Sequence, residues 1–176
     1  MRAEISLGVL CVVVAACASA SSLLPTSDDA AVYVAALDSL AVPGTPLVVL
    51  DSTITIPSNA PLLTTAQRMG ADSAMRTGLI TWQSVAVPRL STQRRVHYAH
   101  ARDLVGDHRD RVAFLAQHGA RGYYRVSGIG YSSDRHRALL YVTHWCGSLC
   151  GESWLVMAVE RPEGWRVEAV QLMMIA

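Results

Sequence analysis

YYRVSGIGY at residues 123–131 opens the part of the chain that decides the fold, because three further strand-like runs follow it closely. Branched apolar and aromatic residues are frequent in these runs, as they are in strands. The other three runs are ALLYVTHW at 138–145, WLVMAVE at 154–160 and WRVEAVQLM at 165–173. Together they predict a C-terminal group of four strands.

Only short turn sequences separate the four runs. They are SSDR at 132–135, CGSLCG at 146–151 and PEG at 162–164. Connections this short force neighbouring strands to run antiparallel, so the pattern predicts a four-stranded meander. A meander of this kind needs helices to cover its apolar face.

Two segments upstream have the signals of covering helices. Ser27 is a candidate N-cap followed by two acidic residues, and apolar residues then recur at helical spacing until Pro43. Asp107, with Asp110 three residues later, opens a second helix that Gly119 would end. We therefore predict an α+β fold in which these two helices cover an antiparallel sheet. The apolar positions of the first helix are Ala30, Tyr33, Val34, Leu37, Leu40 and Ala41.

The middle of the chain gives weaker signals. LVVL at 47–50 is typical of a buried strand, and the alternation at 96–101 favours another. Prolines and glycines interrupt every periodic pattern between residues 57 and 93. In that stretch the sequence indicates only a short helix at 65–75.

The N-terminus is typical of an export signal. Arg2 precedes an apolar run at residues 5–16, which is shorter than the about 20 residues of a membrane-spanning helix. VAAC at 14–17 resembles the lipobox of bacterial lipoproteins, in which the cysteine is lipidated and becomes the first residue. Alternatively, ASA at 18–20 fits an ordinary secretory cleavage site, and cleavage there would discard Cys17.

The lipobox interpretation divides the chain into three parts. Residues 1–16 are a signal peptide, residues 17–26 a small-residue tether and residues 27–176 a single α+β domain. This interpretation predicts an exported protein that a lipid on Cys17 anchors to a cell membrane or outer membrane. The ordinary signal predicts a periplasmic or secreted protein instead.

Charge argues against one class of partner. All fifteen basic residues are arginines, acidic residues are interspersed among them, and the net charge is only +1. A surface that binds nucleic acid needs clustered cations, so we predict no nucleic-acid partner. The sequence predicts no cofactor, and it does not identify a small-molecule or protein partner.

Cys146 and Cys150 form the sharpest local motif. A three-residue spacer across a hairpin turn is within disulfide reach, and export would place the pair in an oxidising compartment. A thiol-exchange pair is one alternative, although such enzymes typically use a two-residue spacer at a helix N-terminus. A metal site made of Cys146, Cys150 and His144 is the other, and it lacks a fourth ligand.

Three segments of the C-terminal region carry a resemblance. They are GYYRVSGIGY at 122–131, RALLYV at 137–142 and CGSLCG at 146–151, with Trp165 near the final strand. These segments are similar to those of a group of uncharacterised exported bacterial proteins. Tyr131 and Ser148 stand where the group has phenylalanine and glycine. The resemblance covers residues 112–175 and implies the fold and export, but no chemistry.

Histidines provide the candidate for acid–base chemistry. His97 and His100 lie in a strand-like segment, where their side chains would point to opposite faces. In a helix they would lie together, close to Asp103 or Asp107. An exported hydrolase that uses His97, His100, Asp103 or His108 is therefore an alternative function.

The leading prediction is an exported lipoprotein domain without catalytic activity, which binds a ligand or an envelope partner or has a structural role. The sequence contains no Gly-x-Ser-x-Gly elbow, His-Glu-x-x-His helix or phosphate loop. Tryptophans at strand positions are expected to pack in the core, and the alternative is that they line a sugar or lipid groove. The tryptophans are Trp82, Trp145, Trp154 and Trp165.

Overall fold

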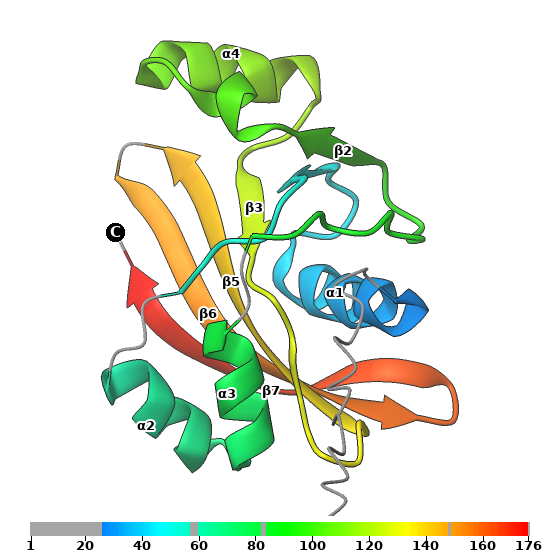
Figure 1. Ribbon diagram of the computed structural model, residues 1–176. Helices are drawn as coiled ribbons and strands as arrows, with labels where there is room; N and C mark the ends of the chain where they lie inside the picture. Colours follow the sequence, from blue (N-terminus) through cyan, green and yellow to red (C-terminus); the bar gives the residue numbers. More distant parts are fainter. Residues whose placement is uncertain (1–25, 57–59, 82–83, 148, 176) are drawn as a thin grey trace, which may run out of the picture.

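A mixed sheet of seven strands forms the centre of the protein, in the order β2-β1-β3-β5-β6-β7, with the short strand β4 also paired to β5. The computed structural model describes residues 26–56, 60–81, 84–147 and 149–175. Helices pack against both faces of this sheet, so the fold is α+β as predicted (Figure 1). No helix in these ranges has the length and apolar character needed to cross a membrane.

The predicted meander is confirmed. It consists of β3 (Tyr123–Val126), β5 (Arg137–Gly147), β6 (Cys150–Arg161) and β7 (Gly164–Ile175), each antiparallel to the next. β5 and β6 are long and pair along nearly their whole length. Strand β7 forms one edge of the sheet.

The first predicted run is two strands rather than one. β3 ends at Val126, and β4 (Gly130–Tyr131) pairs with β5 further along. At the interruption, the Ser127 hydroxyl accepts a hydrogen bond from the Tyr141 backbone N–H at 2.8 Å. A side chain thus takes the place of a backbone acceptor, which allows the strand to break without an unsatisfied donor.

Two parallel strands extend the meander. β1 (Leu47–Leu50) pairs in parallel with β2 (Val96–Ala99) and with β3. All four residues of β1 are buried, as expected for a strand covered on both faces. The strand predicted at 96–101 ends earlier, because the 3-10 helix η1 (Ala101–Leu104) follows it.

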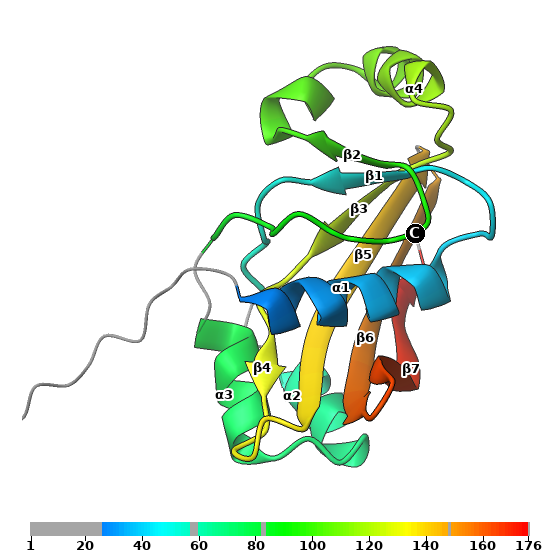
Figure 2. The ribbon, with the colours of Figure 1, turned by 90° about the vertical axis from the view of Figure 1, so that its right-hand side faces the viewer.

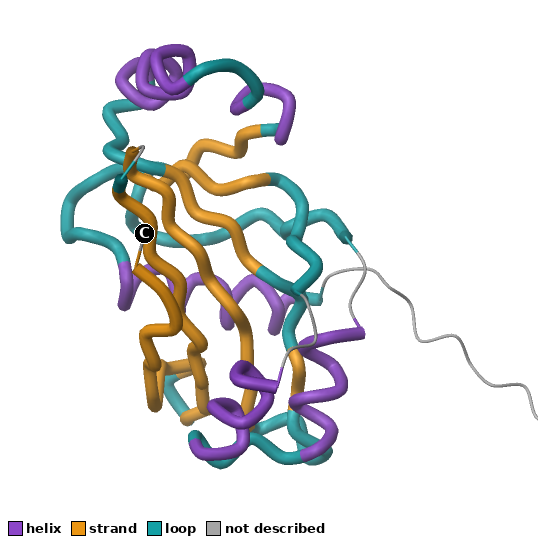
Figure 3. Tube along the Cα trace, turned by 90° about the vertical axis from the view of Figure 1, so that its left-hand side faces the viewer, coloured by secondary structure: helices purple, strands orange, loops and turns teal. Residues whose placement is uncertain are grey.

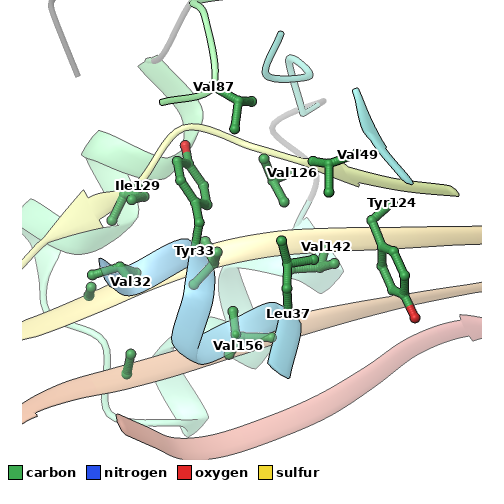
Figure 4. Close-up of a cluster of buried hydrophobic side chains, with 14 of the residues drawn as sticks. Val32, Tyr33, Leu37, Val49, Val87, Tyr124, Val126, Ile129, Val142 and Val156 are labelled. Atoms are coloured by element: carbon green, nitrogen blue, oxygen red, sulfur yellow. The ribbon is translucent and has the colours of Figure 1, made fainter. Parts of the chain in front are cut away.

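Helix α1 (Ser27–Leu40) covers one face of the sheet (Figure 2). Its N-cap is Thr26 rather than Ser27, and Thr26 and Asp29 form a capping box. The predicted apolar stripe is only partly correct, because the buried residues include Val32 and Ala36 instead of Ala30 and Val34. Figure 4 shows its contact with the sheet, where Val32, Tyr33 and Leu37 lie beside Val126, Val142 and Val156.

The opposite face of the meander is covered by α2 (Ala60–Arg68) and α3 (Ser73–Thr81), as Figure 3 shows. The single helix predicted at 65–75 is wrong. Gly70, with φ of 86°, lies between the two helices in a conformation that favours glycine. The Asp72 carboxylate then accepts a hydrogen bond from the Met75 N–H at 2.8 Å and starts α3.

Helix α4 (His108–Gln117) has the predicted caps but not the predicted place. Asp107 and Asp110 form its capping box, and Gly119 has the left-handed φ of 64°. The helix does not cover the meander. It packs at the end of the sheet that carries the two parallel strands (Figures 1 and 3). The buried cluster at this contact contains Leu115 of α4 together with Val48, Leu50, Ala99, Leu104 and Ala120.

Candidate functional site

The disulfide lies at the turn between β5 and β6. Cys146 and Cys150 are bonded, with their Cα atoms 5.1 Å apart. Leu149, within the turn, is 91% exposed. As a disulfide, the two sulfurs are not metal ligands. Across the described ranges, no group of three or more histidine, cysteine, aspartate or glutamate residues is placed to hold a metal ion.

His144, the third residue of the alternative metal site, packs against an aromatic ring. Its imidazole stacks on Tyr124 with 4.4 Å between ring centroids. Burial lowers the pKa of His144, and the nearby Glu152 opposes this effect. Burial also raises the pKa of Tyr124 to about 12. A Cβ at Gly122 would overlap the Nε2 atom of His144, so this ring depends on a glycine beneath it.

The candidate catalytic histidines do not converge. His97 packs against His118, whereas the His108 ring lies edge-on to Trp145 at 5.6 Å. His100 follows β2 and points to Asp51. Asp103 binds the backbone N–H of His100 at 2.8 Å and not its imidazole. The structure therefore gives each of the three histidines a different partner.

The pair formed by His100 and Asp51 was not predicted. The Nδ1 atom of His100 contacts a carboxylate oxygen of Asp51, and both side chains are partly exposed. Asp51 follows β1 and His100 follows β2, and the strands are parallel and in register up to Leu50 and Ala99. The two side chains therefore lie together at the carboxyl ends of two parallel strands, where ligands often bind in parallel sheets.

A groove follows the outer side of α1. Its volume is about 620 Å³, within the range of about 300–1,000 Å³ typical of ligand pockets. A row of small apolar residues on α1 lines it, and so does Trp165. Charged residues also line it. The lining comprises Ser27, Ala30, Ala31, Val34, Ala35, Asp38, Arg89, Ser91, Glu163, Gly164 and Trp165.

The wall opposite α1 is fixed by interactions with the sheet. The Tyr98 hydroxyl accepts a hydrogen bond from the Leu90 N–H at 2.6 Å and donates to the Pro88 carbonyl at 3.2 Å. The Arg89 guanidinium lies 4.5 Å from the centroid of the Tyr98 ring. These contacts hold the segment beside α1, so the groove is formed without a ligand.

The described tryptophans pack against other side chains, and one of them also lines the groove. Trp145 stacks on Tyr123 at 5.4 Å, and the Arg111 guanidinium lies 5.1 Å from its ring centroid. Trp154 is partly buried against the core on the α1 side. Trp165 also packs on that core and at the same time lines the groove. Trp82 lies outside the described residues, as does Cys17.

The chain matches no protein-family model, no curated protein and no solved structure. The resemblance to the exported bacterial group therefore stays a prediction from the quoted segments.

Proposed function

We propose that this protein is a membrane-tethered binding module without catalytic activity, and that the groove along α1 is its ligand site. In this proposal a lipid on Cys17 tethers the domain, and residues 17–26 link the lipid to α1. The groove begins at Ser27, so a bound ligand would lie close to the tether.

The outer face of α1 is the observation that carries the proposal. A surface helix normally presents polar residues to water. Here Ala31 is exposed, while Ala30, Val34 and Ala35 are partly exposed, and these four residues form an apolar strip. Arg89 and Glu163 border the same groove, and the structure gives neither of them an ion pair within its described ranges. An apolar strip with two such charges suits an amphiphilic ligand.

The distribution of histidines supports binding over hydrolysis. General acid–base catalysis needs the acid or base within hydrogen-bond reach of the substrate. The groove contains Asp38 and Glu163 but no histidine, and Asp38 is held by Arg94 at 2.8 Å. Apolar contact with two polar anchors is the arrangement typical of ligand pockets.

The test uses the dye 1-anilinonaphthalene-8-sulfonate, whose aromatic rings match the apolar strip and whose sulfonate matches Arg89. We expect saturable binding by the folded domain. Ala31→Glu would fill the groove, repel the sulfonate and weaken the affinity at least tenfold. Ala116→Glu is the matched control, since Ala116 is also an exposed alanine on a helix. No binding by the wild-type domain, or equal affinity in both variants, would reject the groove.

One observation favours a second candidate, an exported hydrolase. The carboxylate of Asp51 holds the imidazole of His100 by its Nδ1 atom, which leaves Nε2 for a substrate or a water molecule. Hydrolysis of p-nitrophenyl acetate compares the wild type with His100→Gln. If the wild type hydrolyses the ester faster than buffer alone and His100→Gln does not, the result supports the hydrolase. Equal rates for the two proteins support the binding module.

A further inference from the structure

Helix α4 contacts β2 through a pair of imidazole rings. His97 projects from β2, and its ring centroid lies 4.3 Å from that of His118, the C-cap of α4. Phe114 packs on His118 from within the same helix, at 4.8 Å. The neighbours of His97 along the strand, Val96 and Tyr98, instead pack on the core beneath α1. His97 thus provides the ring contact between β2 and the helix, in addition to the buried Ala99 of the same strand.

The surroundings of His97 suit a neutral ring and not a charged one. Its Nε2 atom is buried and has no hydrogen-bond partner. A protonated imidazole donates from both nitrogens, so it would place an unsatisfied N–H at this position. Desolvation is costlier for a charged group than for a neutral one.

The charged and titratable groups around His97 come from two elements. His118 faces it from α4, and Arg95 lies just before β2. Strand β1, whose Val48 pairs with His97, is made only of leucine and valine. Burial first, then His118 and Arg95, lower the pKa of His97 from its ordinary value of 6.5. No carboxylate in the described ranges is placed to offset these effects, since none contributes to this pKa.

We propose that the contact between His97 and His118 is an acid-sensitive latch, which releases α4 from β2 when His97 becomes charged. Release uncovers the apolar residues under α4, including Val48 and Leu50, which are 0% and 6% exposed in the closed form. Helix α1 and the buried residues of β5 and β6 belong to two other clusters, so they stay folded.

The direction of the pH effect follows from the proton affinity of His97. The ring binds its proton more weakly when α4 is docked than when it is released. The latch is therefore fully closed above the ordinary pKa of 6.5, and acidification below that value favours release. Between this pH and the lowered pKa of the docked state, the ratio of released to docked helix rises by up to about tenfold per pH unit.

Hydrogen exchange of the α4 amides between pH 7.5 and 4.5, corrected for the intrinsic exchange rate, tests the latch. We expect protection of α4 and β2 to fall as the pH drops below about 6.5, while β5 and β6 keep theirs. His118→Asn keeps a residue suited to the helix end but removes the ring, and it should abolish most of this pH dependence. Arg95→Gln should reduce the extent of release at low pH, because removing this positive charge raises the pKa of docked His97 toward its ordinary value.

His136→Gln is the matched control. His136 is exposed, pairs with Glu160 at 2.7 Å and does not touch α4, so its loss should leave the profile unchanged. Two results would overturn the latch. One is a pH profile of α4 that is the same in His118→Asn as in the wild type. The other is simultaneous loss of protection in α4, α1 and β5, which would mean global acid unfolding.

Discussion

Replacing Gly130 with alanine should detach α3 from the sheet. The backbone of β4 touches that of α3 here. A Cβ at Gly130 would overlap the Met75 carbonyl and lie 2.8 Å from the Leu79 nitrogen. Gly130 does not have a positive φ, so alanine can adopt its backbone conformation and the effect is purely steric. Helical backbone cannot rotate away as a side chain can. Met75 and Leu79, both fully buried, must therefore move out of the core with the helix.

Overpacking of this kind costs about 1–3 kcal/mol, and the rigid backbone puts Gly130→Ala near the upper end. Urea denaturation measures the loss. Gly78→Ala probes the same contact from the α3 side, with a Cβ 2.8 Å from the Gly130 Cα. Alanine in a helix is about 1 kcal/mol more favourable than glycine, so Gly78→Ala should lower the free energy of unfolding less than Gly130→Ala does. Thr77→Ala, on the exposed side of α3, is the control. A Gly130→Ala domain as stable as the wild type would refute the reasoning.

Three further predictions concern other parts of the chain. Changing Cys146 and Cys150 together to serine should lower the free energy of unfolding by about 2 kcal/mol, the entropy of closing so short a loop; equal thermal stability of the two proteins would contradict this. Tyr131→Phe removes the hydroxyl that donates to the buried Asp29 carboxylate at 2.6 Å, and urea denaturation should show a loss of about 1.5–3 kcal/mol, whereas no loss would mean that Asp29 finds another donor. Cys17→Ser should move the protein out of the detergent phase or leave it unprocessed, and a mature wild-type chain without lipid, seen by intact mass, would count against the anchor.

Local signals were sufficient for the C-terminal half of the fold. The turns at 132–135, 146–151 and 162–164 each join strands that pair directly, so a local pattern describes their contacts. The disulfide also joins residues only four apart. The capping box of Asp107 and Asp110 depends on one helical turn and was predicted for the same reason.

The contacts that were missed join segments far apart in the chain. Gly78 and Gly130 let α3 approach β4 closely, and neither glycine has a local signature of that contact. The groove forms where α1, the segment at 89–91 and the β6–β7 turn meet. Trp165 illustrates the difficulty. The sequence placed it correctly on a strand, but whether a strand tryptophan is buried or lines a groove depends on what lies over the strand.

The pair of Asp51 and His100 depends on the pairing of two strands, which a local sequence pattern does not reveal. The sequence places His100 three residues before Asp103, and the structure does join them, but through the His100 backbone N–H. This bond uses the Asp103 carboxylate to cap the start of η1 and involves only the backbone of His100. Because β1 and β2 are parallel and in register, the imidazole meets the residue that follows β1. The pair of Asp51 and His100 thus arises from strand pairing. Neither residue lines the groove, so His100→Gln and Ala31→Glu test the two candidate functions independently.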